Sequence, residues 1–359
     1  ELAWLAVDDP LPVLSQAIRF SWIVLRRLVP RGSVGARLAS LPSTVVRQNP
    51  TLKIEPRTGA FKRAPRPPQA ATLCAPALRQ SGIEAFRPVP ILLYHAVTAN
   101  PTRQLETFTV SPATFARQLD AIVEAGAATM TVTQYLAARA AATLPERVVV
   151  ITFDDAYADF YVNALPALAE RSLACTLYTA TGFLEGRPSL RIARRPPDRM
   201  LSWEQLPELA AAGVEIGAHS HSHFHLDTLS RRSVRWELET CKALLEDALE
   251  RPVPSFAYPN GHTSASVRRL VIDTGYESAC GVRNALSWEH DDRYRLARLT
   301  VRSTTGDTTF RTWLEGNSAP VAPPDEVLKT RAFRAYRRSR ALVTRREGSD
   351  FQTLDTARI

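Results

Sequence analysis

The feature that most constrains the fold of this chain is a regular alternation of short apolar runs and amphipathic helical segments between residues 89 and 303. Such an alternation indicates parallel strands joined by helical crossovers. About seven such units in one domain predict an α/β fold that closes, or nearly closes, into a barrel. The predicted strands lie at residues 89–94, 128–132, 148–153, 174–179, 214–218, 255–258, 277–282 and 295–301.

Capping signals predict where several helices begin. Ser111 followed by Pro112 predicts one helix start, and the sequence S-W-E-Q at residues 202–205 predicts a capping box. Asn163 is predicted to cap the helix that follows the strand at residues 148–153. Residues 230–250 predict a long, charged amphipathic helix.

Basic charge is concentrated at the two ends of the chain. Residues 1–87 contain 13 Lys and Arg against 5 Asp and Glu, and residues 321–359 contain 9 against 5, whereas the middle is slightly acidic. We therefore predict a basic, Pro/Arg-rich, poorly structured extension and linker at 1–88, a catalytic domain at 89–303, and a C-terminal helix and basic tail at 304–359. The ends could contact an anionic surface weakly, and no specific nucleic-acid site is predicted.

No transmembrane helix or secretory signal is predicted. The apolar segment at residues 11–29 is interrupted by Arg19, Arg26 and Arg27, so it lacks a run long enough to span a membrane. The order of its charges does not fit a signal peptide. The four cysteines are scattered without a C-x-x-C pair, which leaves the compartment open.

Polar residues follow directly after several predicted strands. They are His95, the pair Asp154 and Asp155, His219, and the P-N-G turn at residues 259–261. Because the C-terminal ends of parallel strands meet at one rim of a barrel, these residues predict an active site at that rim.

Four of the seven histidines lie between His219 and His225. Imidazole-rich tracts are a recurring metal-binding composition, and a carboxylate pair after a buried strand is a usual place for a site. A lone histidine can instead be a satisfied polar residue, and a lone Asp-Asp pair can be a turn. We interpret the two stretches together as halves of one metal site.

Four motifs then resemble one enzyme family. Residues 152–157 read T-F-D-D-A-Y, residues 216–223 read I-G-A-H-S-H-S-H, residues 256–261 read F-A-Y-P-N-G, and residues 94–97 read Y-H-A-V. In their order along the chain they resemble the polysaccharide deacetylase family, the NodB-homology domain of carbohydrate esterase family four, and its subgroup with a Y-H-x-V opening. The resemblance implies a distorted, TIM-barrel-like (β/α)7 barrel.

The resemblance also implies roles for individual residues. Asp155, His219 and His223 would bind one divalent metal ion, most simply zinc, with cobalt or nickel as substitutes. The alternative register, in which His221 and His225 are the ligands, fits the flanking residues less well, so these two are assigned to the loop.

The same family pattern assigns the acid–base chemistry. Asp154 would be the general base, and His95 is the candidate general acid, with a structural role as the alternative. Tyr258 and Asn260 would contact the oxyanion or the substrate. The sequence departs from the family at Ala156, which replaces a glycine, at Phe224 and at Asn260, and it shows no clear match for the arginine that orients the base.

The function that the resemblance implies is a metal-dependent hydrolase that removes N-acetyl groups from an N-acetylhexosamine polysaccharide or oligosaccharide. The alternatives are a metal-dependent amidase for a small C–N substrate and a non-catalytic glycan-binding protein. The family suggests a cell-envelope or extracellular location, while a cytoplasmic one stays open because no targeting segment is predicted.

Overall fold

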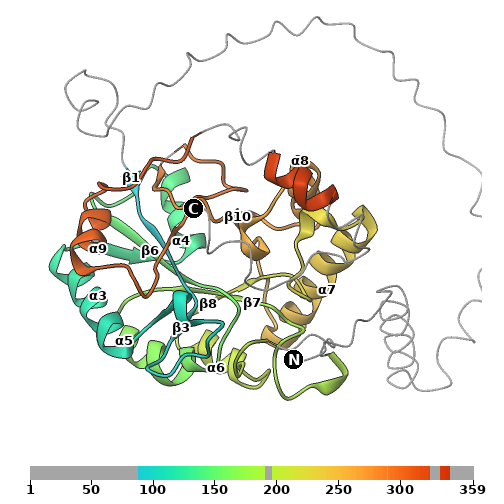
Figure 1. The fold of residues 1–359 in the computed structure, drawn as a ribbon, viewed down its shortest axis with the longest axis horizontal. Helices are drawn as coiled ribbons and strands as arrows, with labels where there is room; N and C mark the ends of the chain where they lie inside the picture. The colour runs from blue at the N-terminus through green and yellow to red at the C-terminus, as the bar shows by residue number, and fades with distance from the viewer. Residues whose placement is uncertain (1–87, 191–195, 289, 324–331, 340–359) are drawn as a thin grey trace, which may run out of the picture. The chain divides into compact units, whose positions relative to one another are not determined.

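The computed structural model describes residues 88–190, 196–288, 290–323 and 332–339. Their centre is a curled sheet with the strand order β10-β9-β8-β7-β6-β2-β12, in which every pairing is parallel, and β5 pairs with β6 beside this path. An isolated bridge between Cys280 and Leu296 joins β10, at one end of the sheet, to the segment that leads into β12, at the other end. The predicted distorted α/β barrel is therefore confirmed (Figure 1). The strands of the sheet are β2 (Ile91–Tyr94), β5 (Ala128–Met130), β6 (Val148–Phe153), β7 (Thr176–Thr179), β8 (Glu215–Ala218), β9 (Ser255–Ala257), β10 (Ser278–Cys280) and β12 (Leu299–Thr300).

Helices surround this sheet, and two small strand pairs lie outside it (Figure 1). The α-helices are α3 (Pro112–Glu124), α4 (Val132–Ala140), α5 (Leu165–Glu170), α6 (Gln205–Ala211), α7 (Arg231–Leu249), α8 (Ala265–Asp273) and α9 (Asp307–Leu314), and residues 332–339 form a further helix. The shorter turns are η1 (Glu106–Phe108), η2 (Phe160–Ala164), η3 (Pro188–Leu190), η4 (Leu226–Thr228) and η5 (Pro259–Gly261). The small pairs are antiparallel β1 (Pro88–Val89) with β11 (Ser287–Trp288) and parallel β3 (Ala96–Val97) with β4 (Thr109–Val110).

The core explains why the apolar runs became strands. All six residues of β6 are buried, as expected for a strand that is covered on both faces. Neighbouring strands approach closely at Gly217 in β8, where a Cβ atom would lie 2.5 Å from the Tyr178 ring. The glycine therefore lets β7 and β8 pack together immediately before the chain reaches His219.

Two local predictions about helix starts were wrong. Ser202 does not cap a helix, because α6 begins at Gln205 after Glu204 and without a side-chain cap; only the bond from the Ser202 N–H to Gln205 Oε1 is formed, at 2.9 Å. Asn163 lies inside η2, a π-helical turn, and its side chain bonds to another segment of the chain. By contrast, Ser111 caps α3 as predicted, accepting a bond from the Thr114 N–H.

The predictions for the ends of the chain fall mostly on residues outside the described ranges. These are the extension at 1–87, including the apolar segment at 11–29, and the tail beyond residue 339. Within the described ranges, no helix is both long enough and apolar enough to cross a membrane. The two predicted domain boundaries, at residues 88/89 and 303/304, stay predictions.

Candidate active site

Asp155, His219 and His223 converge at the C-terminal rim of the barrel. Asp155 follows β6, His219 follows β8, and His223 lies four residues further along the same loop. Asp155 Oδ1 lies 3.1 Å from His223 Nε2 and 3.5 Å from His219 Nε2. One ligand atom from each residue lies within 4.8 Å of the other two, and all three side chains are buried. The sequence prediction therefore named three residues that the fold does bring together.

The surroundings of His219 leave its inward-facing nitrogen able to bind a cation. The ring places Nδ1 2.8 Å from the backbone carbonyl of Ala257. Because a carbonyl only accepts hydrogen bonds, Nδ1 carries the proton and the Nε2 lone pair faces the carboxylates. Burial lowers the pKa of His219 to about 4, against an opposing effect of Asp154, so the ring is neutral at pH 7.

The carboxylate of Asp155 is ionised in this setting. Burial alone would raise its pKa, but the imidazoles of His223 and His219 outweigh burial and hold the pKa well below its usual range. Its Oδ1 atom is buried without a hydrogen bond of normal geometry from the described residues. A buried anionic oxygen that faces two imidazole nitrogens fits a bound divalent cation. Asp155 and Ala156 both have positive φ values, 75° and 71°, which explains why a glycine would suit position 156 better.

Asp154 is held by an arginine that sequence reasoning missed. Arg298 donates from Nη1 to Asp154 Oδ1 at 2.7 Å and from Nη2 to Oδ2 at 2.8 Å, and it also bonds Thr152 Oγ1. Burial acts to raise the pKa of Asp154, but Arg298 and then His219 outweigh it, so the pKa is lowered. The statement that no arginine matches the base-orienting position is therefore wrong for the structure. The sequence marks Arg298 as unusual, because it is the one charged residue in the apolar run at 296–301, but it does not name the partner.

His95 follows β2 at the same rim. Its ring packs against Phe108 at 5.1 Å between centroids, and its Nδ1 atom is buried without a hydrogen-bond partner among the described residues. Burial lowers the pKa of His95, against the opposing charges of Asp155 and Asp154, which places His95 within electrostatic reach of both carboxylates.

The backbone beyond His95 is fixed from the η2 turn. Asp159 accepts a bond from the Val97 N–H at 2.6 Å, and Asn163 donates to the Val97 carbonyl at 2.7 Å. This is the contact that replaces the predicted capping role of Asn163. The backbone N–H and the backbone carbonyl of Val97, two positions after His95, are therefore both hydrogen-bonded. These two bonds limit how far this segment can move.

A buried glutamate on α7 holds the loop between the two candidate histidine ligands. Glu237 Oε2 accepts bonds from the N–H groups of His221, at 2.9 Å, and Ser222, at 2.7 Å. The His221 ring points elsewhere, with Nδ1 2.9 Å from Thr181 Oγ1 and its edge against Trp236. These contacts are those of a loop residue, the role that the sequence predicted for His221.

Tyr258 and Asn260 lie on the β9–η5 connection. The Tyr258 hydroxyl donates to the Tyr294 carbonyl, and the Tyr258 backbone N–H donates to the Cys280 carbonyl. Both donors of Tyr258 therefore make hydrogen bonds within the protein. Asn260 has a φ of 55°, and its Nδ2 atom lies 3.4 Å from His225 Nδ1. The predicted contact of Tyr258 and Asn260 with the oxyanion or the substrate stays a prediction. The hydrogen bonds of Tyr258 do not support such a role for this residue.

A model of the polysaccharide deacetylase family matches residues 141–279, which contain Asp154, Asp155, His219 and His223. Residues 141–279 therefore match the polysaccharide deacetylase family, whose members are hydrolases, as the sequence motifs predicted.

Individual relatives agree with this assignment. The Bacillus subtilis (strain 168) protein YxkH, which carries a provisional name as a polysaccharide deacetylase, is 24% identical over 228 residues, or 63% of this chain and 76% of that protein. Two solved structures share the fold. The Streptococcus pyogenes deacetylase PplD in complex with acetate has a TM-score of 0.56 and 22% identity over 62% of this chain and 96% of its own. IcaB from Ammonifex degensii has a TM-score of 0.55 and 23% identity over 64% and 97%.

Proposed function

We propose that this deacetylase is a metal-dependent hydrolase that removes N-acetyl groups from an N-acetylhexosamine glycan. The observation that carries the proposal is the convergence of Asp155, His219 and His223 on one point, directly beside a carboxylate, Asp154, that Arg298 holds on both oxygens. Three ligands of these types leave open positions on a divalent ion, as a catalytic site requires. Zinc fits the ligand set best, with cobalt or nickel as substitutes.

The metal and the protein divide the chemistry between them. A bound ion would lower the pKa of a water molecule and polarise the acetyl carbonyl. Asp154 is placed to accept the proton of the attacking water, because each carboxylate oxygen that bonds Arg298 keeps a second acceptor position. The water oxygen bonds to the acetyl carbon, the C–N bond breaks, and the amine nitrogen takes up a proton, so that acetate and a free amine result.

His95 is the candidate donor of the proton to the leaving amine. It lies within electrostatic reach of Asp154 and Asp155, and its buried Nδ1 makes no hydrogen bond within the described part of the chain. The alternative is that His95 packs beneath the site against Phe108. His95→Ala separates the two, because an amine needs a proton to leave and a phenolate does not. A donor role predicts a far greater loss on an amide than on an aryl acetate, and equal losses would assign His95 to packing.

The glycan substrate is supported by the family and by what the relatives are named for. The direct test is acetate release from N-acetylglucosamine oligomers by the full chain, with its metal removed and with zinc added back. Asp154→Asn should reduce release by roughly 10²–10⁴-fold while the zinc content per chain is retained. Arg311→Ala, on the far helix α9, is the control. Acetate release that survives metal removal would refute metal dependence. Activity only on small amides would refute the proposal that the substrate is a glycan.

A further inference from the structure

The helix at residues 332–339 is attached to the barrel through arginines. Arg337 Nη2 lies 2.6 Å from Asp227 Oδ2, in a pair whose side chains are 11% and 0% exposed. Arg338 donates from Nε to the backbone carbonyl of Asp227 at 2.7 Å. Removing one partner of a buried ion pair is strongly unfavourable, so this contact is a firm anchor for the described part of the helix.

The same helix turns its aromatic residues outward. Phe333 is 39% exposed and Tyr336 is 54% exposed. Residues three apart lie on one side of a helix, so the two rings form one apolar strip. An ordinary surface helix buries its apolar side, whereas this helix exposes Phe333 and Tyr336 and partly buries Arg334 and Arg337. Burial in the fold therefore does not account for the two aromatic rings.

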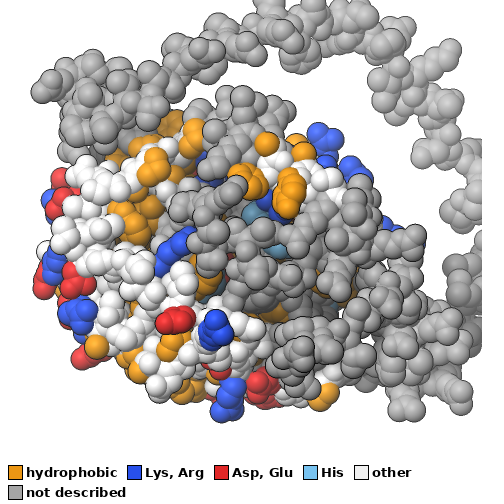
Figure 2. Space-filling view, viewed as in Figure 1, with side chains coloured by type: hydrophobic (Ala, Val, Ile, Leu, Met, Phe, Trp, Pro, Cys, Tyr) orange, Lys and Arg blue, Asp and Glu red, His pale blue; other side chains and the backbone are white. Residues whose placement is uncertain are grey.

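The helix lies beside the catalytic rim. Asp227 is four residues after the ligand His223, on η4. The pKa of His262 is lowered first by burial and then by the charges of Arg337, His225 and Arg334. His262 in turn stacks on His225 at 4.9 Å. Figure 2 shows histidine side chains near the centre of one face of the molecule, next to hydrophobic side chains.

We propose that the helix at residues 332–339 is a wall of the substrate site, on which Phe333 and Tyr336 bind sugar rings of the glycan beyond the residue that is deacetylated. The proposal rests on the proposed function and adds to it an extended substrate. Aromatic faces bind the apolar faces of pyranose rings, and they bring little conformational freedom to lose. The anchor at Asp227 ties the strip to the loop that carries His223, so a bound chain would lie in a fixed position relative to the reacting bond.

The test compares a long substrate with a short one. The N-acetylglucosamine pentamer reaches beyond the reacting sugar, whereas 4-nitrophenyl acetate does not. The double variant Phe333→Ala/Tyr336→Ala should raise KM for the pentamer about tenfold, a loss of about 1.4 kcal/mol of binding, and lower the ratio of pentamer to ester kcat/KM by a similar factor. Ile272→Ala, which removes an exposed apolar side chain from α8, is the matched control. Arg337→Ala should reproduce the KM increase by releasing the helix.

A direct measurement of pentamer binding tests the helix proposal independently of catalysis. Calorimetry of the pentamer with the metal chelated should show weaker binding by the double variant than by the wild type. If wild type releases no acetate from the pentamer but the binding difference appears, the proposed function fails, whereas glycan binding by the helix is supported. Equal pentamer affinity in both proteins would overturn the helix proposal. Unchanged KM with lost binding to phosphatidylglycerol vesicles would also overturn it, by assigning the aromatics to a membrane surface.

Discussion

Two arginine–carboxylate pairs of this deacetylase have nearly the same length and opposite surroundings. Arg298 Nη1 lies 2.7 Å from Asp154 Oδ1 at the catalytic rim, where the side chains are 0% and 3% exposed. Arg311 Nη1 lies 2.8 Å from Glu124 Oε2 between α9 and α3, where they are 51% and 60% exposed. Water and salt screen the second pair, while the first can release neither charge to solvent. The two pairs therefore differ in how much their loss should destabilise the fold, and the cause is their burial rather than their length.

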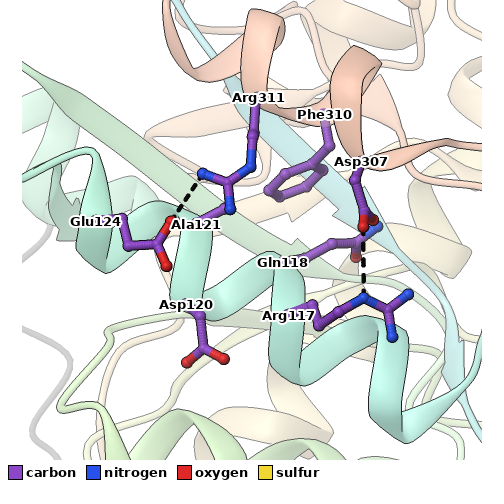
Figure 3. A pocket seen from close by; sticks show the side chains of 8 residues that line it. All are labelled: Arg117, Gln118, Asp120, Ala121, Glu124, Asp307, Phe310 and Arg311. Carbon is purple, nitrogen blue, oxygen red and sulfur yellow. Dashed lines mark hydrogen bonds and ion pairs between the residues drawn. The ribbon is translucent and has the colours of Figure 1, made fainter.

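The exposed region has other features that could be mistaken for a site. Figure 3 shows a pocket between α3 and α9 with two ion pairs across it, the second of which joins Arg117 to Asp307 at 3.4 Å. The pocket-lining residues include none of the predicted catalytic or metal-binding residues. Its charges are mixed in sign, about half exposed, and paired with one another across the pocket. The catalytic rim differs because its charges are buried and point at one another.

The largest effect should come from removing a proposed metal ligand. His223→Ala should lose the bound metal and with it more activity than the roughly 10²–10⁴-fold expected for loss of a general base. His221→Ala removes an equally buried imidazole from the same loop, but one that bonds Thr181, so its metal content should stay near that of wild type. Metal analysis of the two purified variants decides the register. Loss of metal in His221→Ala together with retention of metal in His223→Ala would show that the assignment of the histidine ligands is wrong.

The buried arginine should come next. Arg298→Met leaves the Asp154 carboxylate buried without its partner, so we expect a loss of about 3–5 kcal/mol in the free energy of unfolding. Adding Asp154→Asn should restore much of that stability, because replacing both members of a buried pair costs far less than removing one. Urea unfolding of the single and double variants measures both effects. A loss below about 1 kcal/mol for Arg298→Met would place this pair with the exposed ones.

The same contrast explains what the sequence could and could not predict. The strands, and the polar residues directly after them, follow from local patterns, so Asp154, Asp155 and His219 were placed correctly on the rim. Arg298 was missed because its partner Asp154 is 144 positions away, and only the curling of the sheet brings the segment before β12 to the end of β6. No local period carries that information.

Glu237 is a second residue whose role could be predicted only in part from the sequence. It lies on the apolar stripe of α7, between Val234 and Cys241, which signals a buried carboxylate but does not name its partner. The backbone N–H groups that it binds belong to a loop whose course depends on β8 and η4. Asn163 likewise looked like a cap by residue type, while tertiary contact with Val97 decided its role. Side-chain roles that depend on distant backbone were the part that the sequence could not provide.

A smaller, pH-dependent effect should come from Glu237. Burial raises its pKa from 4.5 to about 7, so between these values the folded chain keeps a proton that the unfolded chain has lost. Stability should therefore fall as pH rises through this window, by up to roughly 3 kcal/mol. Glu237→Gln has no such proton, so its stability relative to wild type should increase from pH 4.5 to pH 7 and then level off. Urea midpoints across this range test it, and a constant difference would contradict the raised pKa.

The smallest effect should come from the exposed pair. Arg311→Ala removes the contact with Glu124, but both side chains are about half in water, so the expected loss is about 0–1 kcal/mol. Because dissolved ions screen exposed charges, any loss should shrink further when the salt concentration is raised from 0.01 M to 1 M. The loss in Arg298→Met should change little over the same range, since salt does not enter its surroundings. Urea unfolding at low and high salt measures both variants. Equal salt dependence of the two would mean that the two pairs share one environment, against the burial that separates them.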